Sequence, residues 1–310
     1  MKRRERVLGA VLTLISVPPL VALVEAVTFH VQNRNNGSIV SSGEEREYLL
    51  HVPKSYDSTR PTPLVISMHG AGGWPAQQRD LSEWNETADE HGFIVVYPAA
   101  LEGSGARSWR MSDETALASD ESFISDLIDQ LEKTYNIDPT RIYANGLSAG
   151  GGMSFALSCT LSDRIAAIGT VAAARVLPWS WCRDERPVPL VAFHGTADSI
   201  VPYDGGRTWI GDITFPDVED WVARWARRNR CGTDAVESVV ATDVTRRSYA
   251  ECAGDADVVL FTIEGGGHTW PGGRPLPEWF VGPTSRGVDA TRQMWAFFEG
   301  HPLGTESRED

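Results

Sequence analysis

Gly146-Leu147-Ser148-Ala149-Gly150 follows residues 141–144, which include the β-branched Ile142 and the aromatic Tyr143, and precedes small residues that suit the start of a helix. This order predicts a strand, a sharp turn and a helix, with Ser148 at the turn. Glycines flank the serine because side chains at those two positions would clash in so tight a turn. The geometry lifts the Ser148 hydroxyl clear of the sheet and leaves the Ala149 N–H free to face a developing oxyanion. The stretch therefore predicts a nucleophile.

A serine hydroxyl needs a base that removes its proton and an acid that orients the base. An apolar strand expected over residues 189–193 leads into Asp198, and a second strand expected over 258–263 leads into His268. Both residues follow strand ends, at the carboxyl edge where open α/β sheets bind ligands. The chain order Ser148, Asp198, His268 is that of an α/β-hydrolase, so we expect His268 to be the base and Asp198 the acid.

Other interpretations of these residues remain open. Asp198 also suits a turn cap, because aspartate favours turns. His194 competes with His268 as base, but it lies beside the strand end and only four residues before Asp198, so we expect it to be structural. Four further histidines show no metal-ligand spacing: His30, His51, His91 and His301. We therefore expect no metal and no zinc-assisted hydrolysis.

A second oxyanion donor is expected in the glycine-rich loop His69-Gly-Ala-Gly-Gly-Trp74, which follows an apolar strand over residues 63–68. Glycines let the backbone approach a substrate closely and turn its N–H groups inward. We expect Ala71 to be the donor, with Gly72 as the second choice. A phosphate-binding loop is the alternative, but the run lacks the Gly-Lys-Ser/Thr ending and the spacing of a dinucleotide fingerprint.

Four motifs carry a resemblance to a known family. They are His69-Gly-Ala-Gly-Gly, Asp138-Pro-Thr-Arg-Ile-Tyr-Ala-Asn-Gly-Leu-Ser-Ala-Gly-Gly, His194-Gly-Thr-Ala-Asp-Ser-Ile-Val-Pro-Tyr and Gly266-Gly-His-Thr-Trp-Pro-Gly-Gly. Over roughly residues 45 to 300 the chain resembles the polyhydroxybutyrate depolymerase and feruloyl esterase group. The resemblance implies Ser148, Asp198 and His268 as a catalytic triad, and it implies that Trp109 and Trp270 lie at the mouth of the active site.

Strands and helices alternate along the chain, which predicts a mostly parallel sheet with helices on both faces, the α/β-hydrolase fold. The strands are expected near residues 46–52, 63–69, 93–97, 141–146, 166–172, 189–194 and 257–263. The helices are expected near residues 120–135, 149–158, 216–229 and 288–299. We expect one catalytic domain over residues 45–302 and a polar tail over 303–310.

The net charge and the aromatic residues indicate which classes of binding partner to expect. The 310-residue chain carries a formal net charge of −14, which disfavours nucleic acid because the phosphates would be repelled. A helix with Arg224, Arg227, Arg228 and Arg230 suits a solvated face better than an anionic contact. Eleven tryptophans are many for this length, and those in loops, such as Trp279, could stack on sugar or phenolic rings or simply pack. No cofactor is expected.

The N-terminus predicts export. Basic residues 2–6 precede an apolar run over 7–24, the pattern of a signal peptide. We expect residues 1–26 to be a signal peptide or, alternatively, an uncleaved membrane anchor, and residues 27–44 to be a linker. The protein is then secreted or periplasmic, or held at the membrane by that segment.

Four cysteines in an exported chain predict two disulfides, and three pairings are open. We favour the adjacent pairs, Cys159 with Cys182 and Cys231 with Cys252. Free thiols in a reducing compartment are the alternative.

Together these features predict an exported serine esterase that forms an acyl-enzyme on Ser148. Short hydroxyalkanoate oligomers, feruloyl esters and acetyl esters are the expected substrates, with soluble esters preferred over insoluble polymer because no polymer-binding segment is expected outside the catalytic domain. An acyltransferase with the same triad and a non-catalytic binding domain of the same fold are the alternatives. The oligomeric state stays open.

Overall fold

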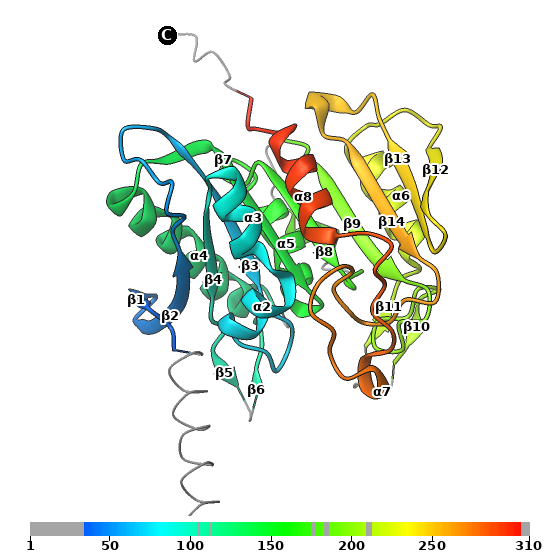
Figure 1. Ribbon diagram of the computed structural model, residues 1–310, viewed down its shortest axis with the longest axis horizontal. Helices are drawn as coiled ribbons and strands as arrows, with labels where there is room; N and C mark the ends of the chain where they lie inside the picture. Colours follow the sequence, from blue (N-terminus) through cyan, green and yellow to red (C-terminus); the bar gives the residue numbers. More distant parts are fainter. Residues whose placement is uncertain are drawn as a thin grey trace, which may run out of the picture.

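Parallel strands form the centre of a ten-stranded sheet in the computed structural model (Figure 1). The structure describes residues 34–103, 106–111, 113–174, 178–182, 186–208 and 213–304. In spatial order the strands are β1 (Gly37–Ser41), β2 (Glu44–His51), β4 (Ile94–Pro98), β3 (Thr62–Met68), β7 (Ile137–Leu147), β8 (Ala167–Val171), β9 (Leu190–Gly195), β14 (Val258–Ile263), β13 (Val244–Tyr249) and β12 (Val236–Ala241). The run from β4 to β14 is parallel, and the strands outside it are antiparallel.

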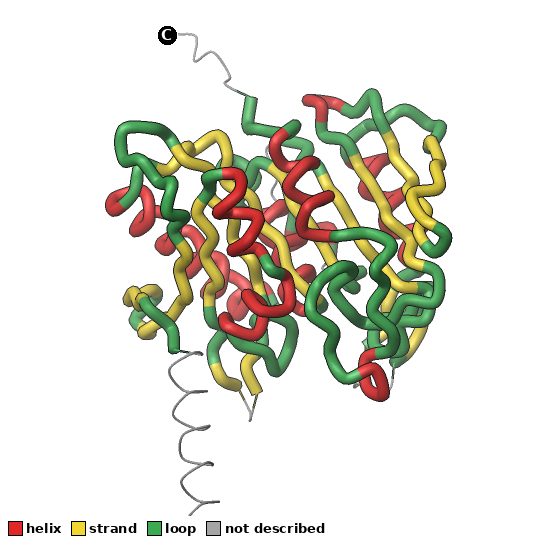
Figure 2. Tube along the Cα trace, viewed as in Figure 1, coloured by secondary structure: helices red, strands yellow, loops and turns green. Residues whose placement is uncertain are grey.

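Helices cover both faces of the sheet, as Figures 1 and 2 show. The front face carries α2 (Pro75–Ser82), α3 (Trp84–His91) and α8 (Ala290–Glu299), and the back face carries α4 (Glu114–Thr134), α5 (Ala149–Thr160) and α6 (Val218–Arg228). Alternate strand residues serve the two cores: Ile94 and Val96 join the back core, whereas Val95 and Tyr97 join the front one. Period-two alternation in buried strands thus produces two apolar layers.

The carboxyl ends of the parallel strands share one edge of the sheet, at the bottom of Figure 1. Short elements gather there: β5 (Glu102–Gly103), β6 (Ala106–Arg107), β10 (Gly206–Arg207), β11 (Thr214–Phe215) and α7 (Glu278–Val281). The 3₁₀ turns are η1 (Trp179–Trp181) and η2 (Ala253–Asp255). This edge is where a site is expected in an open α/β sheet.

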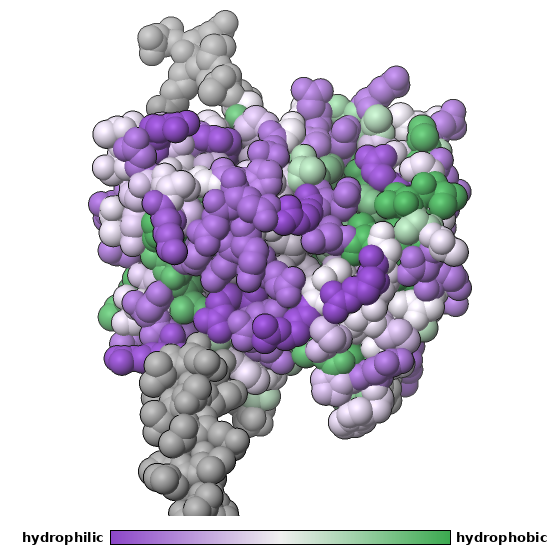
Figure 3. Space-filling view, in the orientation of Figure 1, coloured by the Kyte–Doolittle hydropathy of each residue, from purple (hydrophilic) through white to green (hydrophobic). Residues whose placement is uncertain are grey.

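The predicted fold class is confirmed, and each predicted strand and helix is present. Several elements were not predicted, among them α2, α3 and the hairpin of β12 and β13. The valines of β12 are exposed, with Val239 at 79%, so this edge strand lacks the alternation that marks a half-buried strand. Its apolar side chains form a green patch at the right of Figure 3.

Residues 27–44 were expected to be a linker, but their described part contains a strand, β1. Residues of β1 pair with β2 along their whole length, from Gly37 opposite Tyr48 to Ser41 opposite Glu44. Residues 1–26 and 305–310, expected to be a targeting segment and a polar tail, lie outside the described residues. At the other end, Leu303 donates its N–H to Thr140 O at 2.7 Å. Among the described residues, no helix is both long and apolar enough to cross a membrane.

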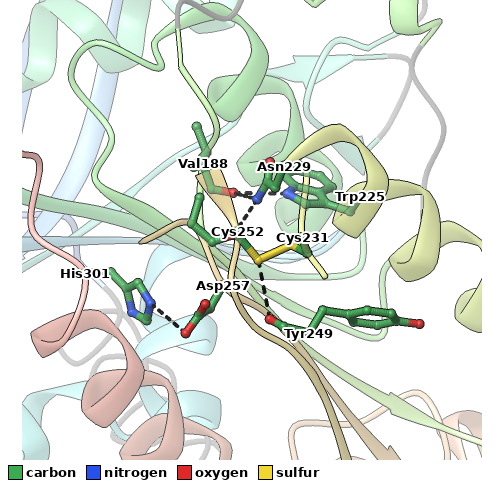
Figure 4. Close-up of a disulfide and its surroundings, with 9 residues drawn as sticks. Val188, Trp225, Asn229, Cys231, Tyr249, Cys252, Asp257 and His301 are labelled. Carbon is green, nitrogen blue, oxygen red and sulfur yellow. Dashed lines mark hydrogen bonds and ion pairs between the residues drawn. A yellow bond between two sulfur atoms is a disulfide. The ribbon is translucent and has the colours of Figure 1, made fainter. Parts of the chain in front are cut away.

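Both favoured disulfides are present, Cys159–Cys182 and Cys231–Cys252. Figure 4 shows the second, which joins the end of α6 to the segment before β14. Beside it, Asn229 Nδ2 and Trp225 Nε1 both donate to Val188 O, at 2.8 and 3.0 Å. The disulfide therefore reinforces a helix end that is already hydrogen-bonded to the start of β9.

Candidate active site

Ser148 lies at the turn between β7 and α5, in a backbone conformation that only a constrained residue adopts. Its φ is 54° and its ψ is −118°, an unfavourable region for a residue with a Cβ. Neighbouring glycines make the turn possible: a Cβ on Gly146 would lie 2.4 Å from Gly150 C, and a Cβ on Gly150 would lie 2.1 Å from Met68 O. The predicted strand, turn and helix are thus confirmed, with Ser148 at the apex.

His268 and Asp198 meet at the same edge of the sheet. The Nδ1–H of His268 donates to Asp198 Oδ2 at 2.8 Å. The other oxygen, Oδ1, accepts from the backbone N–H groups of Ile200 and Val201, each at 2.8 Å. The Asp198 side chain is fully buried and that of His268 is 7% exposed. With its proton on Nδ1, the imidazole keeps Nε2 as a free acceptor.

His194 lies within β9, beside the same oxygen of the Asp198 carboxylate that accepts from His268. Its Nε2 is 3.5 Å from Asp198 Oδ2 and 2.8 Å from Val201 O. A carbonyl oxygen can only accept, so Nε2 carries the proton and donates to Val201 O. Burial lowers the pKa of His194, which favours the neutral ring. His194 therefore holds the turn that carries Asp198.

Ser148 and His268 line one pocket of about 400 Å³. Ala71 and Ala149, the expected oxyanion donors, line it too. Within the described part of the chain, neither backbone N–H has a hydrogen-bond acceptor. The N–H of Gly72, in contrast, donates to Arg107 O at 2.7 Å, which favours Ala71 over Gly72 as a donor.

The rest of the lining is mostly apolar and comes from segments far apart in the sequence. The apolar residues are Leu81, Leu147, Ala173, Ala174, Ile200, Val201, Ile213, Phe215, Leu276, Pro277, Phe280 and Val281. Polar side chains are few, and Gln77, Gln78, Ser108 and Thr208 supply them. An apolar cleft with a few polar groups is typical of a small-molecule site.

The three tryptophans named from the sequence lie in different settings. Trp109 is 3% exposed and donates its Nε1–H to His69 O at 2.9 Å. Trp270 is fully buried and donates to Thr291 Oγ1 at 2.9 Å. Neither is among the lining residues of the pocket. Trp279 is 88% exposed and is not a lining residue, whereas its neighbour Phe280, 5.7 Å away between ring centroids, lines the pocket.

Sequence reasoning missed two walls of the pocket. One is α2, whose residues Gln78 and Leu81 line the pocket together with the glycine-rich loop, and the other is the β10–β11 region with Phe215. Pro75 at the start of α2 was an available signal, because proline favours the first helical turn. The β10–β11 region offers no such signal, since its strands are two residues long.

Comparisons with known proteins agree with this architecture. The family described as Esterase PHB depolymerase matches residues 46–177. Feruloyl esterase B of Piromyces equi is 31% identical over 229 residues, which cover 72% of this chain and 42% of that protein. NocK of Nocardia uniformis, an esterase by name, is 31% identical over 270 residues, which cover 80% of this chain and 77% of that protein.

Solved structures show the same fold at low identity. An acetyl xylan esterase from Aspergillus awamori has a TM-score of 0.58 and 14% identity, covering 75% of this chain and 93% of its own. A ferulic acid esterase from Anaeromyces mucronatus, solved with ferulic acid, has a TM-score of 0.53 and 16% identity, covering 86% of this chain and 89% of its own. Family match and fold together show that this chain belongs to the polyhydroxybutyrate depolymerase and feruloyl esterase family of α/β-hydrolases.

Proposed function

We propose that this chain is a serine esterase in which Ser148, His268 and Asp198 form the catalytic triad. One observation carries the proposal: a strained serine and a histidine that is hydrogen-bonded to a buried carboxylate line the same apolar pocket. The family to which the chain belongs supports it, as do the relatives named as esterases.

The first half of the reaction forms the acyl-enzyme. Ser148 Oγ attacks the ester carbonyl carbon while His268 Nε2 takes its proton. The carbonyl oxygen becomes an oxyanion, which accepts hydrogen bonds from the backbone N–H groups of Ala71 and Ala149. When the C–O bond breaks, the proton on His268 passes to the departing alkoxide, and an alcohol leaves. Asp198 keeps the imidazole in the correct tautomer and stabilises its charged form throughout.

The second half returns the enzyme to its starting state. A water molecule gives a proton to His268 Nε2 as its oxygen attacks the acyl carbon, and a second oxyanion forms between the same two N–H groups. Collapse of this intermediate breaks the bond to Ser148 Oγ, which recovers the proton from His268. The carboxylic acid is then released, and no cofactor takes part.

The pocket supports a small acyl or aryl group as the substrate's apolar part. Leu276, Pro277 and Phe280, from the loop after His268, supply much of one wall. The feruloyl and acetyl esters named for relatives, and short hydroxyalkanoate oligomers, are the classes we propose. Export is part of the proposal, and it is supported by the two disulfides and by the N-terminal sequence.

Hydrolysis of para-nitrophenyl acetate and butyrate by the wild type and by Ser148→Ala tests the proposal. We expect the variant to lose turnover on the order of 10⁶-fold, as when other enzymes lose such a nucleophile. Its thermal unfolding should be unchanged, because only one hydroxyl is removed from a partly exposed turn. Retention of more than about a tenth of the activity would contradict the mechanism. An added alcohol acceptor separates hydrolysis from acyl transfer, since a transferase would form mainly the new ester.

A further inference from the structure

The catalytic steps above give no role to the buried side chain of His69, the first residue of the glycine-rich loop over residues 69–74. This loop carries Ala71 and is called the oxyanion loop below. His69 is 1% exposed, and both ring nitrogens have hydrogen-bond partners. The backbone N–H of Ala100 donates to Nε2 at 3.1 Å, so Nε2 is an acceptor and the ring proton is on Nδ1. That Nδ1–H donates to Gly70 O at 2.7 Å. Burial lowers the pKa of His69 to about 4, so this neutral tautomer persists at pH 7.

The carbonyl of Gly70 and the N–H of Ala71 belong to one peptide unit. A trans peptide is planar, and its C=O and N–H point in opposite directions. Two hydrogen bonds fix Gly70 O, one from His69 Nδ1 and one from the Gly73 N–H at 3.0 Å. Fixing the carbonyl therefore fixes the direction of the Ala71 N–H, which belongs to a residue that lines the pocket.

Trp109 holds His69 itself in place. Its indole N–H donates to His69 O at 2.9 Å, and the two rings lie 5.5 Å apart at 37°. Next to Trp109, the Arg110 N–H donates to Asp120 Oδ2 at 2.6 Å, and Asp120 Oδ1 pairs with Arg46 at 2.8 Å in the core. The segment with Trp109 is thus anchored to a buried ion pair.

We propose that His69 is a positioning residue that orients the Ala71 N–H toward the oxyanion, and that Trp109 holds His69 in the position this requires. The inference rests on the proposed function, since it assigns the Ala71 N–H to an oxyanion. Trp109 is buried because its indole packs against His69 and the oxyanion loop; it does not line the pocket.

Two substitutions separate the ring nitrogens of His69. Asparagine places an amide nitrogen near the position of Nδ1, so His69→Asn can still donate to Gly70 O. Glutamine reaches the position of Nε2 and not that of Nδ1, so His69→Gln loses this bond. We expect kcat to fall about tenfold to a hundredfold in His69→Gln, short of the loss of a whole oxyanion donor. KM should stay within about twofold, and His69→Asn should recover most of kcat.

A tetrahedral analogue reports on the oxyanion site directly. The inhibition constant of a trifluoromethyl ketone should rise in His69→Gln by about the factor by which kcat falls, because both depend on oxyanion stabilisation. Equal losses of kcat in His69→Gln and His69→Asn would overturn the proposal. A fall in kcat with unchanged ketone inhibition would overturn it as well.

Trp109→Phe tests the clamp even if the histidine variants do not fold. Trp225→Phe is its matched control, since Trp225 is also buried and donates to a backbone carbonyl, Val188 O, at 3.0 Å. We expect kcat and ketone affinity to fall several-fold in Trp109→Phe and to stay within about twofold of wild type in Trp225→Phe. Equal behaviour of the two variants would overturn the role of Trp109.

Amide hydrogen exchange at Gly73 distinguishes this proposal from the esterase proposal. The Gly73 N–H shares Gly70 O with His69, so it should exchange at least about tenfold faster in His69→Gln than in wild type and near the wild-type rate in His69→Asn. This outcome would support the positioning role even if no ester were hydrolysed. Unchanged exchange in His69→Gln would overturn the positioning role even in an active esterase.

Discussion

Two histidines lie within 3.5 Å of the Asp198 carboxylate, and only His268 lines the pocket. Their positions in the sequence favoured His268 over His194 as the base, because His194 lies beside a strand end and only four residues before Asp198. The sequence could not show which groups each ring would hydrogen-bond. The hydrogen bond from His194 to Val201 O depends on a turn that brings the carbonyl back toward β9. A local pattern predicts which residues reach one edge of a sheet, and only the folded loops decide their contacts.

Alanine substitutions should separate the two histidines. His268→Ala should lower kcat on the order of 10⁴-fold or more with little change in stability, because it removes the base. His194→Ala should lower the free energy of unfolding by about 2 kcal/mol, because it leaves a cavity and an unpaired Val201 carbonyl, and should lower kcat far less. Rates and urea unfolding of both variants check this. Equal losses of turnover with unchanged unfolding would leave the base unassigned.

Acid pH should reveal the buried state of His69. Its pKa, lowered by burial from 6.5 to about 4, lies below that of an exposed histidine, so the unfolded chain binds the proton first. The stabilising contribution is complete above pH 6.5 and is lost as pH falls toward 4, by roughly 3 kcal/mol in all. Urea unfolding at pH 7, 6, 5 and 4 should show a smaller decline in His69→Asn than in wild type. Identical declines would contradict the shift.

The turn between β7 and α5 is the element that sequence alone could define best. It depends on two close backbone approaches, at Gly146 and Gly150, and glycine is the residue that permits them. The helix α4 was predicted to begin at residue 120 but begins at Glu114, where Asp113 caps it by accepting from the Ala116 N–H. Polar first turns carry little hydrophobic periodicity, so element starts are hard to place.

Gly150→Ala should destabilise the protein by about 3 kcal/mol or more, because the new methyl group would meet Met68 O at 2.1 Å. Gly300→Ala is the matched control, since its nearest neighbour would be Phe297 O at 3.5 Å and its φ of −79° is ordinary. Urea unfolding should show almost no change there. Comparable stability in the two variants would contradict the tight packing of the turn.

The disulfide Cys231–Cys252 closes a loop with a sequence separation of 21. Replacing both cysteines with alanine should lower the free energy of unfolding by about 3 kcal/mol, chiefly because the unfolded chain regains freedom. Peptide mapping of the unreduced protein should join Cys231 to Cys252 and Cys159 to Cys182. Four alkylatable thiols in unfolded, unreduced protein would contradict both bonds and weaken the case for export.

At the scale of the whole molecule, the sheet and its buried helices were predictable because segments with the apolar pattern of a strand alternate along the chain with segments that have that of a helix. Elements without a clear hydrophobic period were not, such as the exposed edge strand β12 and the short helices α2 and α3, whose buried positions include the polar residues Gln78, Ser82 and Thr87. The candidate active site was likewise predictable only in part. Residues at strand ends were predictable from chain order, whereas the pocket walls combine segments whose proximity no local pattern encodes.

Covalent labelling tests the central claim most directly, because an activated serine reacts with a fluorophosphonate as it would with an ester. Intact-mass analysis and peptide mapping should find one adduct per chain, on Ser148, with loss of esterase activity in step with labelling. Labelling should be absent in Ser148→Ala and strongly slowed in His268→Ala, whose base is missing. An unlabelled protein, or an adduct on another serine with full loss of activity, would contradict the assignment of Ser148 as the nucleophile.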